Sequence, residues 1–150
     1  MTENFRIVAR GGHPDFLDLP WSQPLADWDH DRLTPMAHGN SRHVVRFVRY
    51  DDRVYAIKET EEHLARGEYE MLRQLRADHL PTVEPVGYVT TESGTRALLI
   101  TRYLDFSLPY RYLFGREENG LTDKLLDAAV VLLVRLHLDR VFWGLSLIHI

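Results

Sequence analysis

Alternating hydrophobic and polar residues predict two β-hairpins in this chain. Residues 44–50 and 53–59 are rich in β-branched and aromatic side chains, and the acidic turn at 51–52 separates them. Residues 86–91 and 97–104 repeat this pattern around a turn that contains glycine. Because both pairs are joined by short connections, we expect antiparallel strands.

A helical period of apolar residues appears at two places. Residues 61–77 lie between the two predicted hairpins, and residues 123–140 follow the second one. The first helix has an apolar stripe on one side, made of Leu64, Met71, Leu72 and Leu75. The second helix has apolar residues around much of its circumference, which predicts that it is well buried: Leu125, Leu126, Ala129, Leu132, Leu133 and Leu136.

The first 36 residues show no regular period. We expect a short strand at residues 5–8 and a short helix at 22–28, with Trp21 and Trp28 holding this segment on the main body. A further short helix is predicted at 109–114. An antiparallel sheet with one helix inserted between its hairpins makes the fold class α+β.

Composition excludes several classes of protein. The net charge is −4 and the arginines are scattered, whereas a nucleic-acid-binding surface normally needs a basic patch. No apolar stretch reaches the ~18 residues of a membrane span. The chain has no cysteine and no apolar leader after Met1, so we expect a soluble cytoplasmic protein without disulfides or cysteine-based metal sites.

Lysine 58 is the leading candidate for a functional residue. The chain has only two lysines, Lys58 and Lys124, and Lys58 is the last residue but one of the predicted strand at 53–59. Within that strand Val54, Ala56 and Lys58 point to one face. A small alanine beside an ammonium leaves room for a flat ring next to a cation. The alternative is an ordinary exposed lysine.

Glutamate 68 is the candidate partner of Lys58. It lies four residues from both Leu64 and Leu72, inside the predicted apolar stripe, whereas Glu70 falls on the opposite side. A carboxylate that faces a core is costly unless a cation pairs with it, so we expect an ion pair with Lys58. The alternative is that Glu68 lies at the edge of the stripe and reaches water.

Other candidate chemistry is weaker. The turn at residues 38–43 could wrap phosphates with its backbone N–H groups, but it contains one glycine, Gly39, so a plain turn is an equal alternative. The eight histidines show no metal-ligand spacing, and no serine lies in a nucleophile elbow. We therefore assign no catalytic residue and no metal ligand.

Residues 38–144 together resemble the N-terminal lobe and first large C-lobe helix of a protein-kinase-like phosphotransferase. Residues 55–58 are similar to the Val-Ala-Ile-Lys motif of kinases, and residues 100–104 are placed like the gatekeeper and hinge. The chain looks closest to the bacterial lipopolysaccharide-kinase-like group and a related uncharacterised family, a domain of unknown function. The signs are the short spacing from Lys58 to Glu68, the run at 68–72, and Leu136-His137 leading into residues 142–144.

The resemblance implies an ATP site. Lys58 and Glu68 would hold the phosphates, Gly39 would belong to the loop over them, and Ala56 would lie beside the adenine. Thr101 would be the gatekeeper, and the backbone of Arg102 and Leu104 would hydrogen-bond the adenine. The phosphate acceptor would be chosen mainly by a C-lobe.

The family pattern breaks after Gly144. Where the resemblance expects a catalytic aspartate this chain has Leu145, and no metal-binding Asn or Asp follows. The tail at 145–150 shares nothing with the family, so we expect a truncated chain whose natural form continues past Gly144. Mg²⁺ would then bind only in the longer parent, and we expect no phosphotransfer by these residues.

The predicted organisation has four parts: an N-terminal extension (1–36), a kinase-like N-lobe (37–104), the hinge and start of the C-lobe (105–144) and a non-family tail (145–150). The predicted function is the nucleotide-binding fragment of an ATP-dependent phosphotransferase, inactive in this form. The alternative is a non-catalytic pseudokinase or a small α+β interaction module without nucleotide. Without C-lobe partners, the apolar helix at 123–140 would favour self-association.

Overall fold

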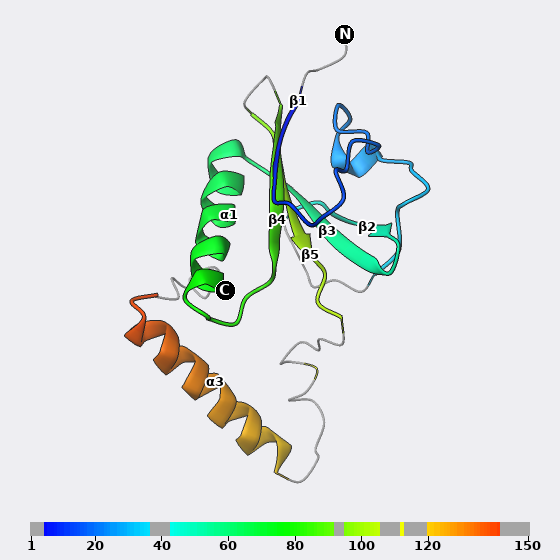
Figure 1. Ribbon diagram of the computed structural model, residues 1–150. Helices are drawn as coiled ribbons and strands as arrows, with labels where there is room; N and C mark the ends of the chain where they lie inside the picture. Colours follow the sequence, from blue (N-terminus) through cyan, green and yellow to red (C-terminus); the bar gives the residue numbers. More distant parts are fainter. Residues whose placement is uncertain (1–4, 37–42, 92–94, 106–111, 113–119, 142–150) are drawn as a thin grey trace. The chain divides into compact units, whose positions relative to one another are not determined.

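The structure is a computed structural model that describes residues 5–36, 43–91, 95–105, 112 and 120–141. The described elements confirm an α+β fold whose sheet is antiparallel (Figure 1). In chain order they are β1 (Phe5–Ala9), the 3-10 helix η1 (Leu25–Asp27), β2 (Val45–Tyr50), β3 (Arg53–Thr60), α1 (Glu62–Ala77), β4 (Pro85–Thr91), β5 (Ala97–Arg102) and α3 (Leu121–Leu138). Among the segments predicted from the sequence, the short helix at 109–114 lies, apart from residue 112, outside the described residues.

The sheet has five strands in the order β1-β4-β5-β3-β2. Both predicted hairpins are confirmed, because β2 pairs with β3 and β4 pairs with β5. The turn between β2 and β3 needs a positive φ at Asp51 (52°), a conformation that Asp tolerates better than most residues. Strand β1 pairs with β4, so the predicted short strand near the N-terminus forms one edge of the sheet.

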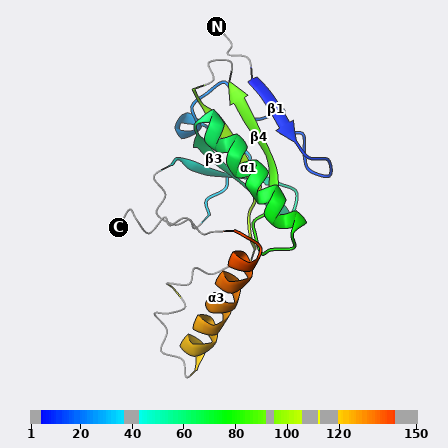
Figure 2. The ribbon, with the colours of Figure 1, turned by 90° about the vertical axis from the view of Figure 1, so that its left-hand side faces the viewer.

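Helix α1 covers one face of the sheet, over β4 and β5 (Figure 2). Its buried residues are Ala65, Tyr69 and Leu72, and Tyr69 packs edge-on against Tyr88 of β4. The predicted stripe is therefore partly wrong, because Leu64 and Met71 are exposed. The sheet packs against the neighbouring face of the helix. There the Tyr69 ring is buried against the Tyr88 ring, and the small side chain of Ala65 lets the helix lie close to the sheet.

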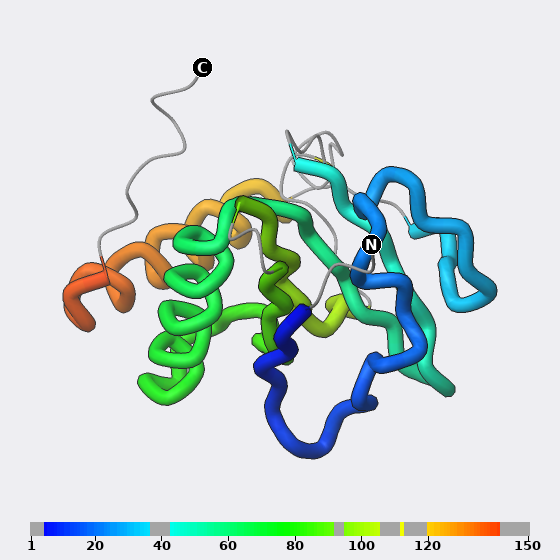
Figure 3. The backbone as a smooth tube through the Cα atoms, turned by 90° about the horizontal axis from the view of Figure 1, so that it is seen from above, coloured from blue at the N-terminus to red at the C-terminus, as the bar shows by residue number. Residues whose placement is uncertain are grey.

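The opposite face of the sheet is covered by the segment between β1 and β2, as the view from above shows (Figure 3). Trp21 and Trp28 are buried there and meet edge to face, which confirms that they hold this segment on the sheet. The cluster also contains Phe16, Leu19, Leu25, Val48, Tyr50, Tyr55, Ile57, Val86, Val89, Leu98 and Ile100. Most of the buried apolar residues of the described chain thus lie on this face.

Two charged side chains fix η1 against the sheet. The Glu59 carboxylate accepts the N–H of Leu25 at 2.8 Å, and the Arg46 guanidinium donates to the carbonyls of Leu25 (3.3 Å) and Ala26 (2.7 Å). Hydrogen bonds to charged groups are stronger than neutral ones, and they satisfy backbone groups that a single helical turn leaves unpaired.

The described residues fall into two compact units. One contains the sheet, α1 and the N-terminal segment up to Leu104, and the other contains Asp78–Leu80 and α3. In the second unit α3 begins after Gly120, which has a positive φ of 78°. Leu136 is the buried residue of α3, whereas Leu126 and Leu133 are exposed, so the predicted burial of this helix is wrong for the described residues. Apolar residues around most of a helix indicate that it packs against another segment, but the sequence pattern does not identify that segment.

Candidate functional site

The side chains of Lys58 and Glu68 meet on the α1 face of the sheet. Lys58 lies near the C-terminal end of β3 and Glu68 at the middle of α1, and the Lys58 ammonium donates a hydrogen bond to Oε2 of Glu68. The lysine side chain is 27% exposed and the glutamate side chain 34% exposed. The ion pair predicted from the sequence is therefore confirmed, and water still reaches both groups.

The strand register and the helical period bring this pair together. Lys58 is paired with Leu99 of β5, which packs against Tyr69 and Leu72 of α1. Glu68 precedes Tyr69 and lies one turn before Leu72. Its side chain therefore lies next to the contact that Tyr69 and Leu72 make with Leu99. The contact of Leu72 with Leu99 and the direction of α1 together place Glu68 within reach of Lys58.

Alanine 56 lies on the same face of β3 as Lys58. It is paired with Thr101 of β5 on one side and with Phe47 of β2 on the other. The rings of Phe47 and Tyr103 meet edge to face with centroids 5.5 Å apart. The small side chain of Ala56 thus lies across from Phe47, two residues along β3 from Lys58.

The predicted hinge residues lie at the end of β5. The N–H of Arg102 donates to the carbonyl of Glu84 at 2.9 Å, and the Arg102 guanidinium approaches the Glu84 carboxylate at 3.5 Å. The Arg102 N–H is therefore directed toward β4 and is already hydrogen-bonded. Leu104 is exposed just beyond the strand, and Gly39 lies outside the described residues.

Sequence analysis missed a further extended segment on the outer edge of β2. The N–H of Thr34 donates to the carbonyl of Phe47, and the N–H of Arg49 donates to the carbonyl of Arg32, both at 2.9 Å. A bridge between Leu33 and Val48 lies between these bonds. The segment is too short for a hydrophobic period to predict it, although Pro35 is a signal that the pairing ends there.

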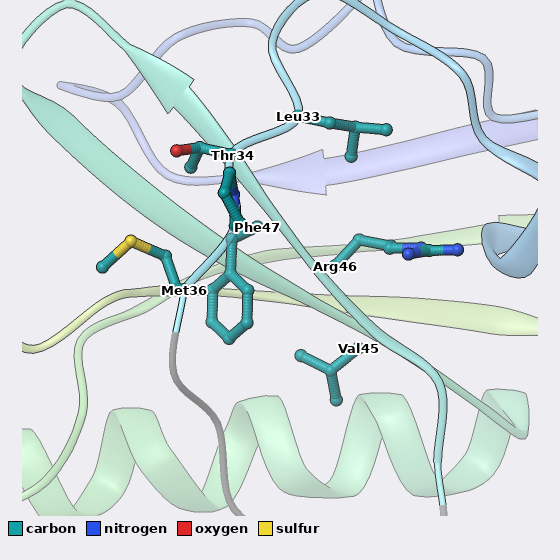
Figure 4. A pocket seen from close by; sticks show the side chains of 7 residues that line it. Leu33, Thr34, Met36, Val45, Arg46 and Phe47 are labelled. Carbon is teal, nitrogen blue, oxygen red and sulfur yellow. The ribbon is translucent and has the colours of Figure 1, made fainter.

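A hollow of about 330 Å³ lies along this edge (Figure 4). Val45 and Phe47 of β2 point toward the side of the sheet that carries α1, whereas Arg46 points away from it. Val45 is the cross-strand partner of Lys58, and Phe47 that of Ala56. The hollow therefore adjoins the positions of the candidate site and continues it outward, with Leu33, Thr34, Pro35 and Met36 as its remaining lining.

Comparisons of the chain with protein-family models, with curated proteins and with solved structures gave no match. Within the described ranges, no three histidine, aspartate or glutamate side chains gather in a way that would hold a metal ion. No helix in the described part of the chain has the length and apolar character needed to cross a bilayer. The fold and the geometry of the ion pair are thus the basis for a functional proposal.

Proposed function

We propose that this chain binds ATP on the α1 face of its sheet, as the nucleotide-binding portion of a protein-kinase-like phosphotransferase. The observation that carries the proposal is the ion pair between Lys58 of β3 and Glu68 of α1. A strand lysine held by a glutamate of the following helix is the arrangement with which kinases grip nucleotide phosphates. The order of strand, helix and hairpin around the pair supports the same proposal.

The electrostatics of the pair suit a phosphate. The Lys58 ammonium has more N–H donors than its bond to Glu68 uses, and it is partly exposed, so a second acceptor can reach it. Glu68 fixes the direction of the flexible lysine stem, which lowers the entropy lost when the ligand binds. An arginine would instead tend to form a two-bond fork with the glutamate.

The base would lie next to Ala56. Phe47 is the cross-strand neighbour of this position and its ring contacts that of Tyr103, and an aromatic ring next to a small side chain is a suitable neighbour for a flat heterocycle. Thr101 faces the same side as Ala56, as the gatekeeper role requires. Leu104 and the loop around Gly39 stay predictions for the adenine and phosphate contacts. The chain would bind nucleotide without transferring phosphate, since Leu145 stands where the resemblance expects an aspartate.

A thermal shift assay with ATP tests the proposal. A saturating ligand at 100 times its Kd stabilises a protein by about 2.7 kcal/mol, which corresponds to roughly 5–10 °C in Tm for a chain of this size. Lys58→Ala should abolish this shift. Lys124→Ala is the matched control, because it removes the other lysine at an exposed position of α3 and should keep the shift.

One observation favours the alternative of an interaction module without nucleotide. The backbone of Arg102 is a predicted adenine contact, and its N–H is already engaged by the Glu84 carbonyl. If this alternative holds, the folded wild-type chain will show no ATP-dependent shift. A shift in Lys58→Ala as large as in the wild type would instead mean that ATP binds away from Lys58. Either result would refute the proposed site.

A further inference from the structure

A second hollow, of about 500 Å³, lies on the face of the sheet opposite the ion pair. Its walls come from the turn at residues 12–14 and from the β2–β3 hairpin. Tyr55 lines it, and Tyr55 alternates along β3 with Ala56 and Lys58, which point to the other face. This hollow is therefore separate from the proposed nucleotide site.

Two polar atoms at this hollow are buried without a partner. Among the described residues, neither Nδ1 of His13 nor the hydroxyl of Tyr55 has a hydrogen-bond partner. Tyr55 is fully buried, the His13 side chain is 7% exposed, and the two rings meet edge to face with centroids 5.9 Å apart. A buried polar group without a partner costs about 1–3 kcal/mol, so a structure that keeps two of them side by side calls for an explanation.

The surroundings of His13 indicate which kind of ligand group could hydrogen-bond both His13 Nδ1 and the Tyr55 hydroxyl. Burial lowers the pKa of His13, so the imidazole is neutral at pH 7. Nε2 faces the Glu84 carboxylate at 3.7 Å, which favours the tautomer with its proton on Nε2. Nδ1 is then an acceptor, whereas the Tyr55 hydroxyl can donate. A single ligand hydroxyl would satisfy both, because it donates to Nδ1 and accepts from Tyr55.

The mouth of the hollow is polar and carries both signs of charge. Asp51 and Asp52 offer carboxylate acceptors, Arg53 offers guanidinium donors, and the Arg32 guanidinium lies 3.9 Å above the centre of the Tyr50 ring. Mixed acceptors and donors around an aromatic wall can bind several hydroxyl groups at once. A simple anion would instead meet two carboxylates at this mouth.

We propose that this hollow binds a small polyhydroxylated molecule of the monosaccharide class, with one hydroxyl between His13 and Tyr55. The two atoms are covered in this structure, so the turn that precedes His13 must move for a ligand to reach them. That turn contains Gly11 and Gly12, and open space surrounds the position of a side chain at both. It can shift without losing packed side chains.

Isothermal titration of the full chain with D-glucose, D-ribose, D-glucose 6-phosphate and inorganic phosphate tests the proposal. At least one neutral sugar should bind, and Tyr55→Phe should weaken that binding about tenfold, the upper end for one neutral hydrogen bond. Tyr55→Phe also removes an unpartnered hydroxyl, so the variant should melt no lower than the wild type. This readout separates a lost ligand contact from a damaged fold. Tyr88→Phe, on the α1 face, is the control and should leave the affinity unchanged.

Two results would overturn the sugar site. The first is that neither neutral sugar binds; if glucose 6-phosphate then binds as tightly as inorganic phosphate, the ligand is recognised by its charge. The second is that Tyr55→Phe binds a neutral sugar as tightly as the wild type.

Discussion

The carboxylate of Glu68 is about one-third exposed, so its contact with Lys58 contributes little to stability. We expect Glu68→Gln to change the free energy of unfolding by less than about 1 kcal/mol, the range of exposed ion pairs. The ATP-dependent thermal shift should nevertheless fall, because the ammonium loses the group that directs it. Glu70→Gln is the matched control, since Glu70 pairs with Arg66 on the exposed side of α1. An equal loss of the shift in both variants would contradict the proposed role of Glu68.

A second residue-scale prediction concerns the Asp18 carboxyl, which is bonded by Tyr50 and Arg32. Burial by itself raises the pKa of Asp18, but the hydrogen bonds from Tyr50 and Arg32 outweigh it and hold the pKa below its usual value. Stability from such a carboxyl is present above its unfolded pKa of about 3.9 and is lost as the pH falls through its folded pKa.

Tyr50→Phe should therefore lower the free energy of unfolding by about 1 kcal/mol at pH 7, a modest value because Asp18 is partly exposed. The difference from the wild type should shrink as the pH drops below about 4, where an ordinary aspartate protonates. Urea unfolding at several pH values measures both quantities. A difference that stays constant down to pH 3 would show that the hydroxyl acts through packing and not through the carboxylate.

At the scale of elements, the contact between β1 and β4 depends on a glycine. Gly87 is paired with Ala9, and a Cβ at Gly87 would lie 2.4 Å from the Val8 carbonyl oxygen and 2.9 Å from the Ala9 Cα. Since both obstacles are backbone atoms, Gly87→Ala should destabilise the chain by about 2–4 kcal/mol through displacement of β1. Gly67→Ala in α1 meets open space and should stabilise it by about 0.5–1 kcal/mol. Urea unfolding of the two variants should give opposite signs, and equal effects would contradict the assigned register.

The positions of strands and helices could be predicted because their signals are local. Alternation and turn residues placed both hairpins, and β2 and β5 differ from the predicted segments by one or two terminal residues. The face of α1 that is buried was predicted less well, since Tyr69 and Ala65 replaced Leu64 and Met71. The helical period allows several neighbouring stripes, and the partner residues on β4 and β5 decide between them.

At the scale of the whole molecule, α3 carries a broad exposed apolar surface in the described structure. Leu126, Val130 and Val134 are each at least half exposed and follow one another at helical spacing. We expect the chain to self-associate through this surface, because a patch of this kind favours burial against a second copy. Sedimentation velocity should show the chain shifted toward the monomer when Val130→Glu and Val134→Glu are combined. Lys124→Glu, an exposed change on the same helix, should leave the association unchanged; an equal effect would point to charge and not to the apolar surface.

The sequence by itself determined the α+β class, both hairpins and the ion pair of Lys58 with Glu68. The class and the hairpins depend on local periodicity, and the ion pair joins a strand lysine to a glutamate in the helix that follows directly along the chain. Only the tertiary structure decided that β1 and the segment at 32–34 extend the sheet, and that His13 meets Tyr55 beneath the β2–β3 hairpin. These contacts join residues far apart in the chain, and their choice depends on shape and burial, which no short window of sequence contains.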